Sequence, residues 1–174
     1  RESVDRLCEI AVELVERSGF TEDVYLRPMV YLSGEVLGVR LHNVEQDTLI
    51  FLSPFPAYLP ETARCHTSTW RRVNDTGIPP RAKVTGIYVN SALAKTEANL
   101  NGFDEAIMLN EDGHVSEGSG ENIFMIRDGR LIAPTPADNV LEGITARSVI
   151  ELARNELGVE LVERCAGVRV LVVV

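Results

Sequence analysis

Apolar residues recur at helical spacing at the start of the chain. They fall on one helical face between Ser3 and Gly19, at Val4, Leu7, Cys8, Ala11, Leu14 and Val15. The Ser3 hydroxyl can cap the first turn, and Gly19 can end the helix in a left-handed conformation. The pattern therefore predicts an amphipathic helix between these two residues.

Two apolar runs at 24–32 and 48–52 read as strands, and Pro28 favours an edge or irregular position for the first. The segment that follows, 53–60, contains three prolines and predicts a stiff connector. We therefore expect a domain boundary there, with 1–52 in one domain and 61–174 in another.

The second half alternates helical and strand patterns. A helix is expected at 89–100, ended by Asn101-Gly102, and another at 144–157, closed by Gly158. Asp-Gly pairs at 112–113 and 128–129 predict two hairpins, with strands at 106–109, 114–116, 122–126 and 130–133, and a further strand is expected at 159–162. Hairpins mixed with helices predict an α/β (mixed α+β) fold. The chain stops in an apolar run, VLVVV, which is either buried within this chain or followed by further residues of the natural protein.

Composition narrows the class of protein. The 174 residues are 45% hydrophobic and 25% charged, which is typical of a globular domain. The net charge of −9 argues against a nucleic-acid-binding surface. The three cysteines form no CxxC pair and the three histidines have no metal-ligand spacing, so neither a disulfide framework nor a metal site is expected. With no membrane-length apolar stretch and no signal peptide, we expect a soluble cytoplasmic protein.

Lys83 is the first candidate for chemistry. It lies among small and apolar neighbours, and Tyr88 follows five residues later. A lysine amine freed of its proton can form an imine with an aldehyde. Taken alone, however, a lysine is more often an exposed charge at the end of a strand.

Glu117 and the start of the last helix are the other two candidates. Glu117 lies in a glycine-rich loop, 116–122, that can approach a ligand, where a carboxylate could keep a ring nitrogen protonated; the alternative is a polar turn. Gly143, Ile144 and Thr145 open a helix whose free N–H groups favour a phosphate, unless Thr145 merely caps it. The three signals together indicate a site for an anionic heteroaromatic cofactor.

Four stretches carry a family resemblance: 82–91 (AKVTGIYVNS), 104–106 (DEA), 116–124 (SEGSGENIF) and 141–145 (LEGIT). They closely resemble the class IV (fold type IV) PLP-dependent aminotransferases, and within that class the branched-chain amino acid aminotransferases. The resemblance runs from about 70 to 162 and extends more weakly to 25–28. It implies a two-domain fold, with 1–52 as the remainder of the small domain, 53–60 as the interdomain connector and 61–174 as an incomplete large domain. Most of the small N-terminal domain and the C-terminal end of the family pattern have no counterpart.

The resemblance also implies residue roles. Lys83 would hold pyridoxal 5′-phosphate as an aldimine and then move a proton between the substrate Cα and the cofactor C4′. Tyr88 would hydrogen-bond the phenolic oxygen of the cofactor, and Glu117 would bind its pyridine nitrogen. The phosphate would lie at Gly143, Ile144 and Thr145, while Glu121 and Asn122 would orient the glutamate loop. Arg27 and Tyr58 match positions that face the substrate near the domain junction.

The implied reaction is transamination between branched-chain L-amino acids (Leu, Ile, Val) and 2-oxoglutarate. The implied assembly is a homodimer or an assembly of dimers. Three alternatives stay open: a D-amino acid aminotransferase, an aminodeoxychorismate lyase of the same fold, and a non-catalytic truncated relative.

Overall fold

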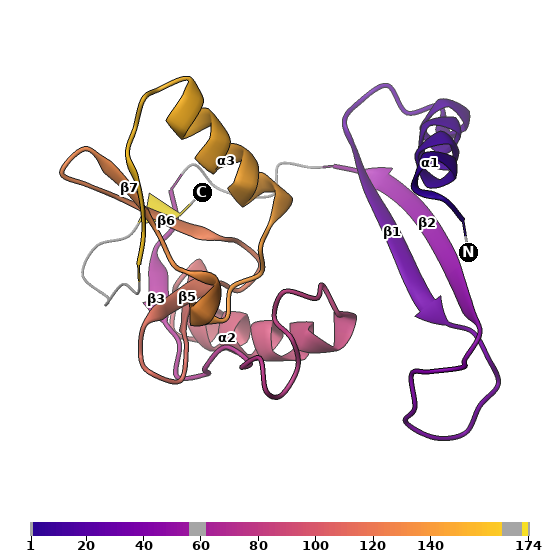
Figure 1. Ribbon diagram of the computed structural model, residues 1–174, viewed down its shortest axis with the longest axis horizontal. Helices are drawn as coiled ribbons and strands as arrows, with labels where there is room; N and C mark the ends of the chain where they lie inside the picture. Colours follow the sequence, from indigo (N-terminus) through magenta and orange to yellow (C-terminus); the bar gives the residue numbers. More distant parts are fainter. Residues whose placement is uncertain (1, 56–61, 165–171, 174) are drawn as a thin grey trace. The chain divides into compact units, whose positions relative to one another are not determined.

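The computed structural model describes residues 2–55, 62–164 and 172–173 (Figure 1). The chain divides into two compact units, Arg1–Glu61 and Thr62–Val174. The elements run in the order α1, β1, β2, β3, α2, β4, β5, β6, β7, α3, β8 and β9, with short 3₁₀ turns before α2 and α3. Each unit is described by itself below.

The first unit begins with the helix α1, Val4–Ser18. The Ser3 hydroxyl accepts a hydrogen bond from the backbone N–H of Arg6 at 3.1 Å, which satisfies one of the free donors of the first turn. Gly19 ends the helix with φ of 73°, a conformation that costs glycine little. The structure thus confirms the predicted helix and both of its ends.

A β-hairpin completes the first unit. Strand β1, Val24–Leu32, pairs antiparallel with β2, Gln46–Pro54, in a register that sets Pro28 opposite Ile50. Both strands are edges of a two-stranded sheet, so a proline that cannot donate a hydrogen bond is tolerated. The first strand is confirmed, whereas β2 is longer than predicted because backbone pairing continues beyond the apolar run. None of the described residues of this unit is buried.

The second unit starts with a three-stranded sheet of order β3-β4-β5. Its strands are β3 (Cys65–Thr67), β4 (Glu105–Leu109) and β5 (Val115–Gly118). The helix α2, Tyr88–Leu100, connects β3 to the parallel β4 and packs on the sheet. The packing is made by small side chains and one methionine: Ala94, Ala98, Ala106 and Met108. Close packing between α2 and β4 therefore rests largely on alanine.

The other sheet has the order β8-β7-β6-β9. Its strands are β8 (Leu161–Glu163), β7 (Arg130–Ala133), β6 (Ile123–Arg127) and β9 (Val172–Val173). The helix α3, Ile144–Asn155, covers β6 and β7 through an apolar cluster that includes Phe124, Leu131 and Ala153. Part of the terminal apolar run is paired within this chain, because β9 lies antiparallel to β6.

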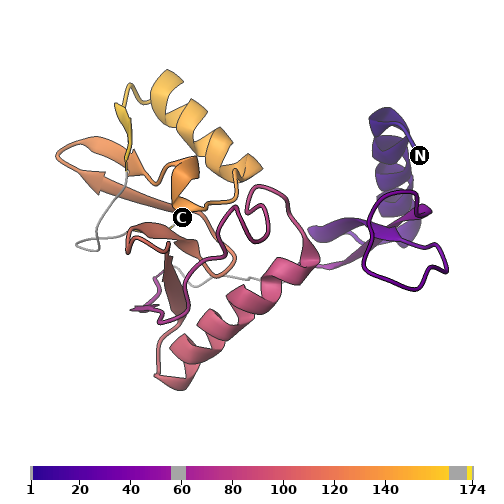
Figure 2. The same ribbon diagram turned by 60° about the horizontal axis from the view of Figure 1, so that its bottom comes forward.

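A central cluster joins the two sheets. It contains Ile107, Leu109, Val115 and Ile123, with Cys65 packed against it. Along β4 the side chains alternate, so that Ala106 and Met108 face α2 while Ile107 and Leu109 face this cluster. In both views α2 and α3 lie on opposite sides of the strands of this unit (Figures 1 and 2). The loop from β5 to β6 thus passes from one sheet to the other.

Both predicted hairpins are confirmed. Gly113 and Gly129 have φ of 83° and 73°, and Asp128 has φ of 52°, so the two-residue turn between β6 and β7 has both central residues in the left-handed region. The last helix ends at Asn155 rather than at 157, and the strand after it spans Leu161–Glu163 rather than 159–162. The mixed α/β class is as predicted.

Within the described ranges, no helix combines the length and the apolar character needed to cross a bilayer. The same residues contain no group of three or more His, Cys, Asp or Glu side chains that could hold a metal ion.

Candidate active site

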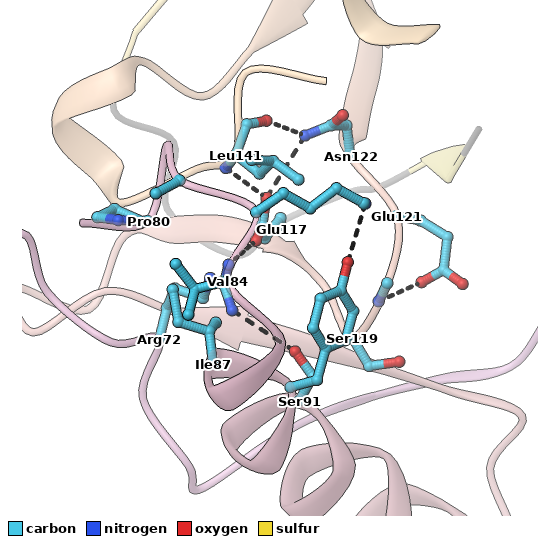
Figure 3. A pocket seen from close by; sticks show the side chains of 14 residues that line it. Arg72, Pro80, Val84, Ile87, Ser91, Glu117, Ser119, Glu121, Asn122 and Leu141 are labelled. Carbon is cyan, nitrogen blue, oxygen red and sulfur yellow. Dashed lines mark hydrogen bonds and ion pairs between the residues drawn. The ribbon is translucent and has the colours of Figure 1, made fainter. Parts of the chain in front are cut away.

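One pocket of the second unit brings together several of the predicted site residues (Figure 3). Its empty volume is about 380 Å³, open solvent at the mouth included. It is lined by residues from four separate parts of the chain: Arg72, 80–91, 117–122 and Leu141. Lys83, Tyr88, Glu117, Glu121 and Asn122 all contribute to this lining. Residues 34 positions apart in sequence (117 − 83) therefore share one cavity.

Lys83 and Tyr88 form one side of the pocket. A 3₁₀ turn, Thr85–Ile87, separates them and leads directly into α2 at Tyr88. Lys83 Nζ donates a hydrogen bond to Tyr88 Oη at 2.9 Å, and Nζ lies 5.6 Å from the centre of the tyrosine ring. The apolar neighbours expected around the lysine are present, since Val84 and the buried Ile87 line the same pocket, but Lys83 itself is exposed.

Glu117 is buried at the centre of the pocket wall. It lies on β5, because this strand continues to Gly118 instead of ending at Ser116 as predicted. Its Oε1 is 2.7 Å from Arg72 Nη2. Its Oε2 accepts hydrogen bonds from Leu141 N at 2.8 Å and from Asn122 Nδ2 at 3.4 Å. Figure 3 shows the carboxylate between these partners. The polar-turn alternative is wrong for this residue.

Two opposing effects set the protonation of Glu117. Burial raises the pKa of its carboxyl group, because the charged form loses hydration. The positive charge of Arg72, the Leu141 N–H and the charge of Lys83 act in the opposite direction and lower it. The net result is a pKa above the ordinary value for glutamate. The site therefore needs its positive neighbours if Glu117 is to be a carboxylate.

Arg72 is a site residue that sequence reasoning missed. It donates to Ser91 Oγ at 3.5 Å and is held in a segment that Asn90 fastens to α2. Asn90 Oδ1 accepts from Val73 N at 3.3 Å, and its Nδ2 donates to Arg71 O at 2.9 Å. Asn90 and Ser91 belong to a stretch that carries the resemblance, but no local spacing marks Arg72, because its role follows from contacts across 45 residues (117 − 72).

The loop after Glu117 is shaped by Glu121. The Glu121 carbonyl accepts from Gly118 N at 2.7 Å, and its Oε2 accepts from Gly120 N at 3.0 Å. A Cβ at Gly118 would lie 2.8 Å from Glu121 Oε2 and 3.2 Å from the Glu121 carbonyl oxygen, so a larger residue would displace the Glu121 side chain. Burial is the main cause of the raised pKa of Glu121. The glycines of the motif thus permit a tight turn beside Glu117.

The start of α3 adjoins the pocket through Asn122. Asn122 Nδ2 donates to Leu141 O at 2.8 Å, and a Cβ at Gly143 would lie only 2.2 Å from Asn122 Oδ1. Gly143 is the N-cap of α3, and no side chain caps this helix, so the alternative in which Thr145 caps it is wrong. Ile144 and Thr145 are exposed and do not line the Glu117 pocket. The first-turn N–H groups therefore donate no hydrogen bond to a capping side chain.

Of the two expected substrate residues, the structure describes only Arg27. Arg27 is on β1 of the first unit, where its Nε and Nη2 donate to Tyr25 Oη at 3.0 and 2.6 Å. Its guanidinium carbon is 5.1 Å from the centre of the Tyr25 ring. Tyr58 lies outside the described residues. The second unit by itself therefore contains the lysine, the glutamate and the helix start.

Comparisons with known proteins identify the family of the chain. Residues 2–171 match the family model described as Amino-transferase class IV. The chain is 48% identical over 164 residues to the "Probable branched-chain-amino-acid aminotransferase" of Aquifex aeolicus, an alignment that covers 93% of this chain and 53% of that protein.

Solved structures give the same result. The branched-chain aminotransferase from Thermoproteus uzoniensis with norvaline superimposes with a TM-score of 0.92 at 42% identity, covering 96% of this chain and 56% of that one. A T.th. branched-chain amino acid aminotransferase complexed with N-(5′-phosphopyridoxyl)-L-glutamate has a TM-score of 0.86 at 40% identity, covering 96% and 54%. The chain spans about half the length of these relatives. With a mixed α/β fold and a family match over nearly its whole length, this chain belongs to the class IV aminotransferases, of fold type IV.

Proposed function

We propose that the protein is a pyridoxal-phosphate-dependent aminotransferase that moves an amino group between a branched-chain L-amino acid (leucine, isoleucine or valine) and 2-oxoglutarate. The observation that carries the proposal is the shared pocket. In it Lys83 Nζ lies 2.9 Å from Tyr88 Oη, and the buried Glu117 carboxylate lines the same cavity. An amine, a phenol and a buried carboxylate complement a pyridine ring that bears an aldehyde.

The chemistry of the pocket residues fits this cofactor. The amine of Lys83 would hold the aldehyde carbon covalently, and Tyr88 would hydrogen-bond the phenolic oxygen next to it. Glu117 would accept a hydrogen bond from the protonated ring nitrogen. The uncapped N–H groups of Ile144 and Thr145, with the Thr145 hydroxyl, would take the phosphate, because a helix N-terminus favours an anion.

When bound, pyridoxal phosphate supplies an electron-accepting ring that stabilises negative charge on the substrate Cα. Lys83 Nζ would move a proton between the substrate Cα and the cofactor carbon C4′. Glu117 would keep the ring nitrogen protonated. Val84 and Ile87 form an apolar part of the wall of the site.

Other residues support or extend the site. Glu121 and Asn122 keep the loop that carries Glu117 in place through the hydrogen bonds described above. Arg27 and Tyr58 belong to the proposal as substrate-facing residues, in keeping with the resemblance of their segments to the family.

The substrate class rests on the relatives. Their names specify branched-chain amino acids, and one is bound to norvaline, a straight-chain analogue of similar size. Another carries an adduct of the cofactor with L-glutamate, the amino acid that corresponds to 2-oxoglutarate. We extend the proposal to a homodimer or an assembly of dimers.

Reductive fixation of the cofactor tests the central claim. This chain contains two lysines, Lys83 and Lys95, so borohydride treatment of the cofactor-loaded protein has two side-chain amines to choose from. We expect mass spectrometry to find the reduced cofactor on the Lys83 peptide, and Lys83→Ala to abolish both fixation and transamination. Lys95→Arg is the matched control and should be fixed as fully as the wild type.

Assays of turnover and of cofactor binding separate two of the remaining alternatives. L-leucine with 2-oxoglutarate should give glutamate, and D-alanine should not; activity with D-alanine alone would replace the proposal by a D-amino acid aminotransferase. A protein that binds no pyridoxal phosphate at micromolar concentration would be a non-catalytic relative.

A further inference from the structure

The buried ion pair between Arg72 and Glu117 is not accounted for by the proposed roles. The two side chains are 5% and 8% exposed and 2.7 Å apart. Removing both charges from water costs several kcal/mol, and apolar residues of similar volume often serve stability equally well. Arg72 Nε, moreover, is buried with no hydrogen-bond partner among the described residues. An incompletely satisfied buried pair contributes little to folding, which points to a role in the site.

The helix α2 holds Arg72 against Glu117. Asn90 binds the backbone on both sides of Arg72, and Ser91 accepts from the guanidinium itself. Further along the same helix, Glu97 accepts from the Ser68 hydroxyl and from the Thr69 hydroxyl and backbone N–H. Three side chains of one helix thus fasten the segment that carries the arginine, so its position is fixed independently of a ligand.

Charge is what Arg72 adds to Glu117. The Leu141 N–H and the Asn122 amide already occupy Oε2, and Arg72 is the partner of Oε1 (Figure 3). The charged groups that act on this carboxyl are Arg72, Lys83 and Glu121, and the titratable phenol of Tyr88 lines the same pocket. The protonation of the Lys83 nitrogen would change as its amine forms and releases a bond to an aldehyde, whereas the guanidinium of Arg72 stays charged, so Arg72 is the constant positive partner.

We propose that Arg72 is a positioning residue that keeps Glu117 ionised and fixed in orientation, so that the carboxylate can hold a proton on a ring nitrogen; the role rests on the proposed function. Arg72 would act through Glu117, its ion-pair partner, rather than on the substrate. The burial of Glu117 supports the argument, because it pushes the pKa of this carboxyl group upward and Arg72 is the first of the groups that oppose it.

The test compares Arg72→Gln with Arg71→Gln in the protein loaded with pyridoxal phosphate. Arg71 is the adjacent, exposed arginine, so its replacement removes the same charge outside the pocket. We expect Arg72→Gln to move the acid limb of the kcat-pH profile upward by about one unit or more, with kcat reduced about tenfold or more on that limb. In the absence of substrate, the pH titration of the absorbance of the bound cofactor should shift upward by a similar amount. Arg71→Gln should match the wild type, and Arg72→Lys should restore most of the wild-type profile.

Each outcome decides the role. A uniform loss of kcat in Arg72→Gln with an unmoved acid limb would show a merely structural arginine and overturn the proposal. If Arg72→Gln fails to fold, Asn90→Ala takes its place, because it keeps the charge of Arg72 but removes the hydrogen bonds to the backbone on both sides of it. A smaller upward shift of the acid limb in this variant supports the role, and an unmoved acid limb rejects it. Wild-type protein that borohydride does not fix at Lys83 overturns the proposed function itself, whereas normal fixation with unchanged Arg72→Gln profiles overturns the Arg72 role alone.

Discussion

Glycine at residue 143 illustrates how single atoms set the geometry of the site. Its backbone, with φ of −65° and ψ of 144°, is open to any residue, so the requirement for glycine comes from space alone. The space is taken by Asn122 Oδ1, 2.2 Å from where a Cβ would stand. Asn122 cannot turn away freely, because its Nδ2 is bonded to Leu141 O and lies 3.4 Å from Glu117 Oε2. One missing methyl group thus allows the helix start to approach the glutamate loop.

Replacing this glycine by alanine should therefore break the contacts of Asn122. We expect Gly143→Ala to lower the free energy of unfolding by about 1 to 2 kcal/mol, the usual loss for displaced hydrogen bonds of a part-buried amide. Cofactor affinity should fall as well, because Asn122 bonds Glu117. Chemical denaturation and a cofactor titration measure the two effects. Gly86→Ala is the control, since a Cβ there meets nothing within 4 Å; equal stability of the two variants would contradict the steric argument.

At the scale of elements, α2 is tied to β4 by a buried carboxylate as well as by alanine packing. Glu105 on β4 is ion-paired with Lys95 on α2, and its Oε1 accepts from Ala106 N at 2.7 Å and Ser119 N at 3.4 Å. Burial raises the pKa of Glu105, but the hydrogen bonds from Lys95, Ser119 and Ala106 outweigh it, and the net pKa is lowered. This carboxylate therefore connects a helix, a strand and the loop that follows Glu117.

The lowered pKa of Glu105 in the folded state determines how the stability of the fold depends on pH. The ionised Glu105 stabilises the fold above its unfolded pKa, near 4.5, and this contribution is lost as the pH falls through the folded pKa. We expect Glu105→Gln to cost about 1 to 3 kcal/mol at pH 7, with the difference from wild type shrinking below about pH 4. Denaturation across pH measures it. Glu151→Gln, an exposed change on α3, is the control. If the stability difference between Glu105→Gln and wild type did not depend on pH, the loss would come from altered hydrogen bonds and not from the charge of Glu105.

The sequence predicts those elements whose cause is local. Ser3 and Gly19 bound α1 by capping, and Asp128-Gly129 forms its turn because both residues accept positive φ. Arg72 and the extension of β5 to Glu117 were missed because they depend on partners across the fold. The residues predicted to bind phosphate, Gly143, Ile144 and Thr145, lie at a helix start that the apolar periodicity locates. The close approach of Asn122 to Gly143, in contrast, cannot be predicted from the sequence. Lys83, which taken alone is more often an exposed charge, became informative only together with Glu117 and the helix start at Gly143.

At the scale of the molecule, burial is distributed unequally between the two units. Among the residues that the structure describes, all of the buried hydrophobic ones belong to the second unit, with those of β4, β5 and β6 among the least exposed. The first unit has regular elements but no buried residue among those described, and its hairpin exposes large apolar side chains such as Tyr31, Leu49 and Phe51. Within this unit, little side-chain packing therefore shields the backbone hydrogen bonds from water.

Hydrogen exchange should follow this difference. Amides open locally at a free energy set by the packing around them, so peptides from β4 and β5 should exchange slowest and peptides from α1, β1 and β2 at least about tenfold faster. Exchange of the native protein followed by mass spectrometry measures the order. If the first unit exchanged as slowly as β4, packing within this chain alone would not explain the exchange rates. If dilution then accelerated exchange in the first unit selectively, a second copy would be what covers its apolar side chains, as a homodimer requires.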